Sequence, residues 1–291
     1  MDATIHHPPP AEPAPFVRWS GMTHIGRMRP NNEDVFLALT FDEREVRFLG
    51  KTGEASLADA DYIFAVSDGM GGAKSGEFAS RFAVDRITRL LPRRFRLPPA
   101  QMLDRFTTIL GELFGAIHQD MLKFGFSYEE CAGMGATLSL GWLTPGRLYF
   151  AHVGDSRLYQ LPRGGGLMQL SHDHTHSGWL RRQGRLNERE ARSHPMRNSL
   201  HQSLGAGHQF VEPQLGFIDC QAGDRFLLCS DGVTDGLWDR QIEELVRQPP
   251  DERASQPPAQ RLVEEAVVSS GRDNATAVVV EIRASADVAA P

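Results

Sequence analysis

The order of strand-like and helix-like segments limits what this chain can fold into. Two adjacent segments, 76–91 and 100–124, repeat apolar residues at helical spacing, and a third helix is predicted at about 257–270. Segments rich in β-forming residues lie before and after them, at 62–67, 136–142, 147–153, 225–230 and 275–282. Because strict alternation of strand and helix is absent, the pattern disfavours a doubly wound parallel sheet. It predicts an α+β fold in which helices cover antiparallel sheets.

Composition narrows the class of protein further. The 291 residues carry 37 acids and 31 bases, a formal net charge of −6, which argues against a nucleic-acid partner. No apolar run approaches the roughly 18–20 residues that cross a bilayer, so no membrane partner is expected. The N-terminal segment lacks the pattern of a secretory signal, and the three cysteines form no CxxC pair. We therefore expect a cytoplasmic protein with free thiols.

The chain ends differ in composition from the rest. Residues 1–15 are dominated by Pro, Ala and His and are expected to form a flexible tail, as are residues 286–291. Tight hairpin turns are predicted at 144–146 and 162–166. The segment 40–60 is expected to be a hairpin and surface loop. A single domain would then span 16–285.

Aspartates recur at the ends of the predicted strands. Asp68 and Asp231 each follow an apolar strand inside the tripeptide Ser-Asp-Gly, and Asp155 follows the strand at 147–153. Two further groups of polar residues lie directly before predicted strands. Asn32, Glu33 and Asp34 precede the strand that begins at residue 35, and Asp273 and Asn274 precede the strand that begins at residue 275. Any one of these would by itself be typical of a turn. Their joint occurrence suggests one site.

Carboxylates gathered at one site raise one another's pKa and destabilise the fold unless a cation balances them. Hard divalent cations such as Mg²⁺ and Mn²⁺ prefer such oxygen ligands. A calcium-binding loop is disfavoured because no series of alternating acids ending in glutamate is present. The segment with His172, Asp173, His174 and His176 allows a zinc site or a solvated loop, of which we favour the loop.

Taken together, these residues resemble the metal-dependent type 2C protein phosphatases, in their bacterial single-domain form. The resemblance covers about residues 17–284. The matching segments, in chain order, are GRMRPNNED (26–34), VSDGMGG (66–72), SGEFAS (75–80), GATLSLGWL (135–143), AHVGDSRLY (151–159), LSHDHT (170–175), RNSLHQSLG (197–205), DRFLLCSDGVTDGL (224–237) and GRDNATAVVV (271–280).

The resemblance implies a four-layer α-β-β-α fold, an antiparallel sandwich flanked by helices, with a flap subdomain at about 176–204. It also implies hydrolysis of phosphoserine and phosphothreonine in proteins with two Mn²⁺ or Mg²⁺ ions. The implied site residues are Asp68 bridging both metals, the Gly69 carbonyl, Asp231, Asp273, Asp34 and Glu33 at the metal pair, Asp155 at a third metal, and Arg27 at the substrate phosphate. Because a metal-activated water attacks phosphorus, Cys131, Cys220 and Cys229 are expected to be structural.

One position departs from the family pattern. Bacterial members commonly have a histidine, a candidate general acid, where this chain has Ala73 followed by Lys74. Another group, such as Lys74 or a metal-bound water, would supply the proton, or turnover would be slow. If no general acid remains, aryl phosphates should be hydrolysed far better than alkyl phosphates.

Three functions remain open on these grounds. An active phosphatase would act on phosphorylated Ser/Thr proteins and oppose a cognate kinase in signalling. A low-activity or non-catalytic phosphoprotein-binding regulator would share the fold. A metal-dependent nuclease fits poorly with an acidic chain. The six flap arginines, Arg181, Arg182, Arg185, Arg189, Arg192 and Arg197, would either contact acidic substrates or form an exposed amphipathic surface.

Overall fold

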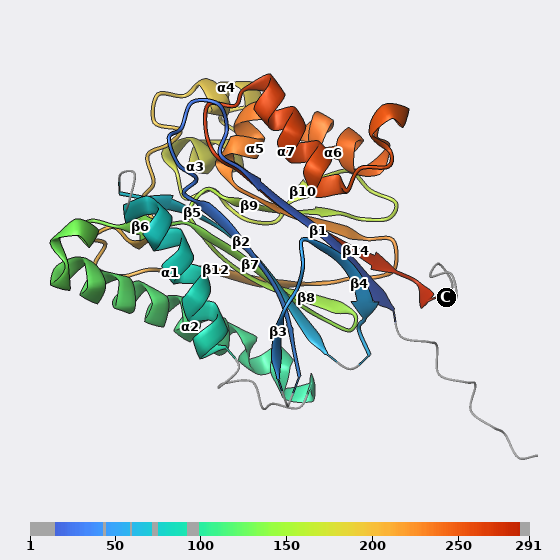
Figure 1. The fold of residues 1–291 in the computed structure, drawn as a ribbon, viewed down its shortest axis with the longest axis horizontal. Helices are drawn as coiled ribbons and strands as arrows, with labels where there is room; N and C mark the ends of the chain where they lie inside the picture. The colour runs from blue at the N-terminus through green and yellow to red at the C-terminus, as the bar shows by residue number, and fades with distance from the viewer. Residues whose placement is uncertain (1–14, 43–44, 59, 72–74, 92–98, 286–291) are drawn as a thin grey trace, which may run out of the picture.

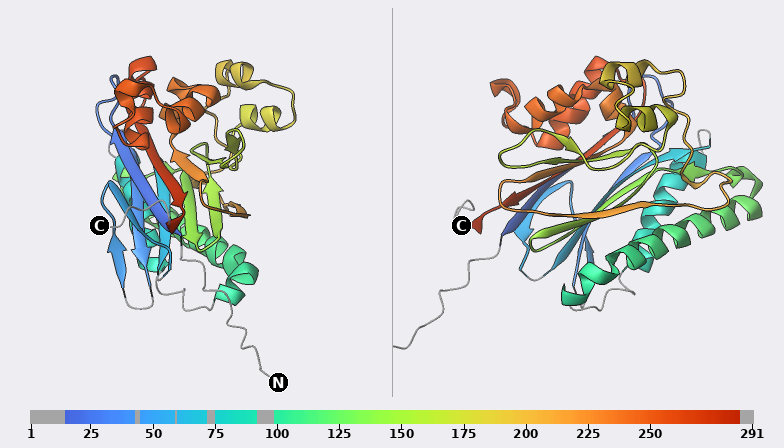
Figure 2. Two further views of the ribbon diagram at one scale, coloured as in Figure 1. Left: turned by 90° about the vertical axis from the view of Figure 1, so that its right-hand side faces the viewer. Right: turned by 180° about the vertical axis from the view of Figure 1, so that it is seen from behind.

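Two antiparallel β-sheets pack face to face between two layers of helices (Figures 1 and 2). The computed structural model describes residues 15–42, 45–58, 60–71, 75–91 and 99–285. Within them, the layered arrangement confirms the predicted α+β sandwich. The predicted tails lie outside the described residues, except for Pro15, whose carbonyl accepts a hydrogen bond from Leu57 N–H.

The first sheet has six strands in the order β10-β9-β13-β14-β1-β4. Its strands are β1 (Phe16–His24), β4 (Thr52–Ser56), β9 (Arg157–Leu161), β10 (Met168–Gln169), β13 (Arg225–Cys229) and β14 (Ala275–Arg283). Side chains alternate between the two faces of a strand. Val278 and Val280 therefore face the other sheet, whereas Ala277 and Val279 face the helices.

The second sheet has eight strands, with β11-β6-β5-β7-β8-β12 in order and β2 pairing with both β5 and β3. Its strands are β2 (Asp34–Phe41), β3 (Val46–Phe48), β5 (Asp61–Met70), β6 (Gly135–Ala136), β7 (Leu138–Thr144), β8 (Arg147–Val153), β11 (Leu204–Gly205) and β12 (Gln214–Asp219). The predicted turn at 144–146 joins β7 to β8, where Thr144 pairs with Arg147.

Helices cover the outer face of each sheet. The eight-stranded sheet is covered by α1 (Ser75–Leu90) and α2 (Pro99–Ser127), whose apolar stripes include Ile87 and Leu110. The six-stranded sheet is covered by α5 (Asp231–Gly236), α6 (Asp239–Arg247) and α7 (Pro258–Ser269). Two helices, α3 (His176–Arg182) and α4 (Glu188–Ser193), lie in the predicted flap, and the short 3-10 helices span Glu129–Cys131 and Asp251–Arg253.

Three strand assignments needed correction. The strand expected at 62–67 runs on through Met70, because its end pairs with β2 and β6. The segment 40–60 forms a β2–β3 hairpin as expected, but β4 leaves it and pairs with β1 in the other sheet. Third, the strands β1 and β12 were not among the predicted segments.

Candidate functional site

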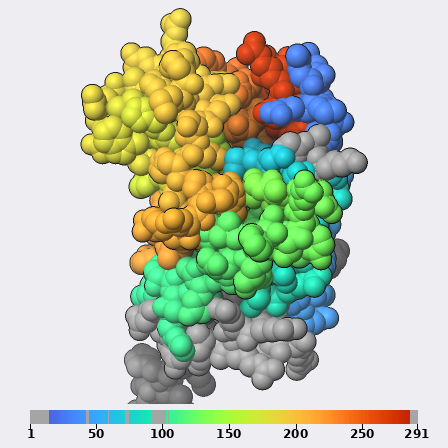
Figure 3. Space-filling view, turned by 90° about the vertical axis from the view of Figure 1, so that its left-hand side faces the viewer, coloured from blue at the N-terminus to red at the C-terminus, as the bar shows by residue number. Residues whose placement is uncertain are grey.

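The predicted acidic residues converge at one end of the sandwich. A cavity of about 340 Å³ is lined there by Arg29, Pro30, Asn31, Glu33, Asp68, Gly69, Met70, Gly71, Thr137, Asp155, Asn198, Leu200, Asp231 and Asp273. Figure 3 shows the face of the molecule at this end, with the flap (yellow) at the upper left, the N-terminal segment (blue) at the upper right and the end of α2 (green) below them. Six of the eight predicted site residues therefore share one cavity.

Both sheets contribute to this site. Asp34 starts β2 and lies directly opposite Asp68 of β5 in the eight-stranded sheet. Asp231 starts α5 immediately after β13, and Asp273 lies two residues before β14, so both belong to the six-stranded sheet. Asp155 lies in the turn between β8 of one sheet and β9 of the other.

Asp34 links the two sheets although it does not line the cavity. Its side chain is only 6% exposed, and its Oδ2 accepts a hydrogen bond of 2.6 Å from the Ser230 hydroxyl. Ser230 precedes Asp231, and its backbone N–H bonds to the Thr276 carbonyl. The hydrogen bond therefore holds the start of β2 against the junction of β13 and β14.

Burial and mutual repulsion raise the pKa of these carboxyl groups. Burial raises the pKa of Asp34 to about 6, and burial with the charge of Asp173 raises that of Asp155 to about 7. The pKa of Asp68 is raised well above its usual range, first by burial and then by Asp34 and Asp231. Burial and the neighbouring Asp155 act in the same direction on Asp231. The cavity therefore favours positive charge.

The donor set fits hard divalent cations. Oδ1 of Asp34 and Oδ1 of Asp231 are buried and have no hydrogen-bond partner among the described residues. Unpartnered buried carboxylate oxygens are costly, and a cation would relieve that cost. Within the described part of the chain, no three His, Cys, Asp or Glu side chains already stand close enough to hold a metal ion. Water molecules, which Mg²⁺ characteristically retains, would have to fill the remaining coordination positions of a bound ion.

Arg27 does not lie in the cavity, contrary to its expected role. Its Nη2 donates to the carbonyl oxygens of Val268 at 2.7 Å and Ser270 at 3.2 Å, at the end of α7. Arg29, two residues later, lines the cavity, and its Nη2 donates to Asp273 Oδ2 at 2.6 Å. Both arginines belong to the same motif. Nothing in the sequence distinguishes Arg29, which faces the cavity, from Arg27, which faces the end of α7.

Several supporting residues were also missed. Asn274, although recognised beside Asp273, has an unpredicted role: its Oδ1 accepts from Glu33 N–H at 2.7 Å and its Nδ2 donates to the Asn31 carbonyl at 3.0 Å. It thereby fixes the loop that carries Arg29. Thr137 Oγ1 accepts from Asp68 N–H at 3.0 Å. Such contacts join residues far apart in sequence, so no local pattern reveals them.

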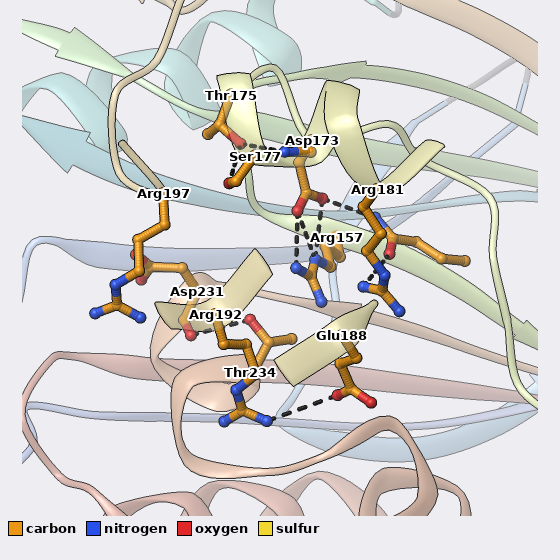
Figure 4. A network of polar contacts seen from close by, with 12 residues as sticks. Arg157, Asp173, Thr175, Ser177, Arg181, Glu188, Arg192, Arg197, Asp231 and Thr234 are labelled. Atoms are coloured by element: carbon orange, nitrogen blue, oxygen red, sulfur yellow. Dashed lines mark hydrogen bonds and ion pairs between the residues drawn. The ribbon is translucent and has the colours of Figure 1, made fainter. Parts of the chain in front are cut away.

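The flap is attached to the site by arginines. Arg197 pairs with Asp235 at 2.7 Å and Arg181 with Asp239 at 2.6 Å. Arg192 donates to the carbonyl oxygens of Asp235 and Leu237. Figure 4 shows Arg192 and Arg197 beside Asp231, with Arg181 closer to Arg157. Three of the six flap arginines thus anchor the flap to α5 and α6, a role that neither interpretation of their charge included.

The histidine segment is a loop, as expected, but it is only partly solvated: His172 and His176 are exposed, whereas Asp173 is buried. The Asp173 carboxylate is buried and pairs with Arg157 at 2.7 Å (Figure 4). His174 Nδ1 accepts from Gly154 N–H at 3.1 Å, and burial lowers the pKa of His174 to about 3. No zinc-type cluster forms here among the described residues.

Ala73 and Lys74, where the chain departs from the family pattern, lie outside the described residues. A larger groove of about 710 Å³ lies on the outer face of the six-stranded sheet, around Trp19, Arg225 and Pro257. It contains none of the predicted site residues, so its size does not make it the centre of the chemistry.

Comparisons with known proteins agree with this geometry. Residues 52–266 match the family described as protein phosphatase 2C. Over 249 residues the chain is 35% identical to the serine/threonine protein phosphatase PstP of Mycobacterium tuberculosis, covering 85% of this chain but only 46% of that protein. It is 30% identical over 259 residues to the serine/threonine phosphatase stp of Listeria monocytogenes, covering 89% and 93% of the two chains.

A solved structure is similar as well. It is the catalytic domain of PstP in complex with two manganese ions, which matches with a TM-score of 0.69 and 30% identity. The match covers 92% of this chain and 99% of that one. Because the chain spans about half the length of full PstP, the likeness concerns the catalytic part of that protein.

Proposed function

Because the chain belongs to the protein phosphatase 2C family, we propose that it hydrolyses phosphoserine and phosphothreonine in proteins with two divalent metal ions. The observation that carries this proposal is the convergence of Asp68, Asp155, Asp231 and Asp273 in one cavity with Arg29. The PstP structure with two manganese ions supports the choice of metal.

The proposed metal ligands are the oxygens that already face the cavity. Asp68, Asp231 and Asp273 with the Gly69 carbonyl would hold the pair, supported by Asp34 and Glu33, and Asp155 would serve a third ion. When bound, the ions would lower the pKa of a water and balance charge on the phosphoryl group. Asp34 would offer its Oδ1 to the metal pair from below the cavity. Its Oδ2 is held by the Ser230 hydroxyl, whereas Oδ1 has no hydrogen-bond partner among the described residues.

We assign substrate-phosphate binding to Arg29 instead of Arg27. The Arg29 guanidinium is held at the cavity wall by Asp273 and remains 46% exposed. A planar guanidinium can donate two parallel hydrogen bonds to a phosphate. Because the guanidinium is already held in place, it would orient the phosphate for attack and so lower the activation barrier of hydrolysis. Arg27, bonded to carbonyls of α7, would instead support the loop that carries Arg29.

We also propose partners and a compartment. Phosphorylated Ser/Thr proteins would be the substrates, and a cognate kinase would oppose the enzyme in cytoplasmic signalling. The names of the relatives support protein substrates. No helix in the described part of the chain is long and apolar enough to span a membrane.

The test is release of phosphate from a phosphothreonine peptide during titration with Mn²⁺. We expect metal-dependent release that Asp231→Asn abolishes. Asp219→Asn, which removes an exposed carboxylate paired with Arg147 far from the cavity, serves as the matched control. Activity that survives Asp231→Asn would overturn the site. Peptide binding without release by the parent protein would favour the phosphoprotein-binding regulator.

A further inference from the structure

A chain of buried hydrogen bonds runs beneath the cavity. Thr137 Oγ1, which accepts from Asp68 N–H, lies 2.5 Å from Ser156 Oγ. The Ser139 hydroxyl lies 3.1 Å from the Ser156 carbonyl oxygen and 2.8 Å from His152 Nδ1. Thr137, Ser139, His152 and Ser156 are each at most 1% exposed. The chain thus connects the backbone of Asp68 to a fully buried histidine.

The contacts of His152 define its protonation. Its Nε2 lies 3.1 Å from the carbonyl oxygens of both Gly154 and His172. Since carbonyl oxygens only accept, Nε2 carries the proton and shares it between the two carbonyls, and the single Ser139 hydroxyl proton is shared between His152 Nδ1 and the Ser156 carbonyl. Burial lowers the pKa of His152 to about 4, in keeping with a neutral ring. One neutral imidazole therefore bonds to β7, to the turn that carries Asp155 and to the segment that leads into the flap.

The two ends of the flap meet each other beside this turn. His174 N–H donates to the Gly154 carbonyl at 2.8 Å, and Gly154 N–H donates back to His174 Nδ1. Thr175 forms a β-bridge with Leu200, and His201 N–H donates to the His174 carbonyl at 2.9 Å. Leu200 lines the cavity. The turn at Gly154 therefore anchors the first flap end directly and the second end through His174.

We propose that His152 is a positioning residue that fixes the Asp155 turn and the base of the flap as one unit. It does not line the cavity and acts through its neighbours. The hydrogen bonds reach Gly154 and Ser156, the residues on either side of Asp155, so losing them frees the carboxylate to move. The same loss releases the His172 carbonyl, in the segment that leads into the flap. The metal-related half of this inference rests on the proposed function.

Four variants test the proposal. His152→Leu removes both polar contacts, whereas His152→Gln keeps an N–H donor on a side chain of similar reach. Tyr62→Phe is the matched control, because it deletes a buried hydrogen bond, from the Tyr62 hydroxyl to the Ser56 carbonyl at 2.8 Å, at the far end of β5. Ser139→Ala breaks the link to Nδ1 with the loss of one hydroxyl, and it replaces His152→Leu if that variant does not fold.

Two measurements are made on full-length, initially metal-free protein. The first is hydrogen exchange of peptides covering 172–204, and the second is calorimetric titration with Mn²⁺. Partners that orient metal ligands typically change affinity by roughly 10–100-fold. We expect His152→Leu to weaken Mn²⁺ binding at least about tenfold and to speed flap exchange selectively by a similar factor. His152→Gln should restore most of both, and Tyr62→Phe should change neither.

The outcomes separate this inference from the proposed function. Parent-like affinity and flap exchange in His152→Leu would overturn it, as would faster exchange spread over the whole chain. A parent protein that binds no Mn²⁺ would refute the proposed metal chemistry, and the exchange measurement would then decide the positioning role by itself. The same criteria apply to Ser139→Ala.

Discussion

Replacing Asp34 by Asn is expected to stabilise the metal-free protein while abolishing metal-dependent activity. The pKa of Asp34 rises from 3.8 to about 6 on folding, chiefly through burial. A carboxyl group with a raised folded-state pKa keeps its proton where the unfolded chain has lost it. Stability is therefore lost as pH rises from about 3.8 through about 6. Each pKa unit is worth about 1.4 kcal/mol, so the cost above pH 7 is about 3 kcal/mol.

Asn removes this cost because it has no charge, and its Oδ1 can still accept from the Ser230 hydroxyl, as Asp34 Oδ2 does at 2.6 Å. We expect the free energy of unfolding of Asp34→Asn to exceed that of the parent by about 3 kcal/mol at pH 8 and by about 1 kcal/mol at pH 4.5. Urea unfolding in EDTA, followed by circular dichroism at both pH values, measures the difference.

Asp61 supplies the control. Its pKa is also raised to about 6 by burial, and its Oδ2 accepts from Trp142 Nε1 at 3.0 Å, at the other end of β5. Asp61→Asn should give a similar pH-dependent gain but leave Mn²⁺ binding and activity unchanged. The reasoning fails if Asp34→Asn is no more stable than the parent at pH 8, or if its gain is the same at both pH values.

The remaining predictions concern the cavity and the leaving group. Arg29→Ala should raise KM for an aryl phosphate about tenfold or more, whereas Arg27→Ala should lower thermal stability with little change in KM; the reverse result would return the phosphate to Arg27. Gly69→Ala should disrupt folding or metal binding, because its Cβ would lie 1.9 Å from the Gly76 carbonyl oxygen. By contrast, Gly115→Ala in α2, with open space around it, should stabilise by up to about 1 kcal/mol in thermal unfolding. If no group replaces the family histidine as general acid, an aryl phosphate should react at least about 10²-fold faster than a phosphothreonine peptide at one pH and Mn²⁺ concentration, and comparable rates would show that a general acid is present.

The sequence was most informative where a local pattern decides the structure. Helical spacing located α1, α2 and α7 to within a few residues, and the turn at 144–146 lies between β7 and β8 as expected. Aspartates at strand ends pointed to the cavity because a strand that ends at a sheet edge delivers its last side chain there. Neither inference needed knowledge of distant contacts.

The predictions that the structure contradicts concern features that depend on contacts between residues far apart in the sequence. The orientation of Arg27 depends on carbonyl oxygens of Val268 and Ser270, more than 200 positions away in the chain. The transfer of β4 to the other sheet depends on its pairing with β1. The flap arginines have ion-pair partners in α5 and α6, which their own segment does not reveal. Tertiary partners, rather than local propensity, decide each of these.

The turn at Asp155 crosses from one sheet to the other, and this has a mechanical consequence. Asp34 and Asp68 move with the eight-stranded sheet, whereas Asp231 and Asp273 move with the six-stranded sheet. A slip of one residue between the sheets, about 3.3 Å along a strand, would pull these pairs apart by more than the length of a metal–oxygen bond. The cavity therefore lies where the two sheets meet. The catalytic rate would depend on how the two sheets are aligned, and it would change with a shift too small to alter bulk measurements of folding.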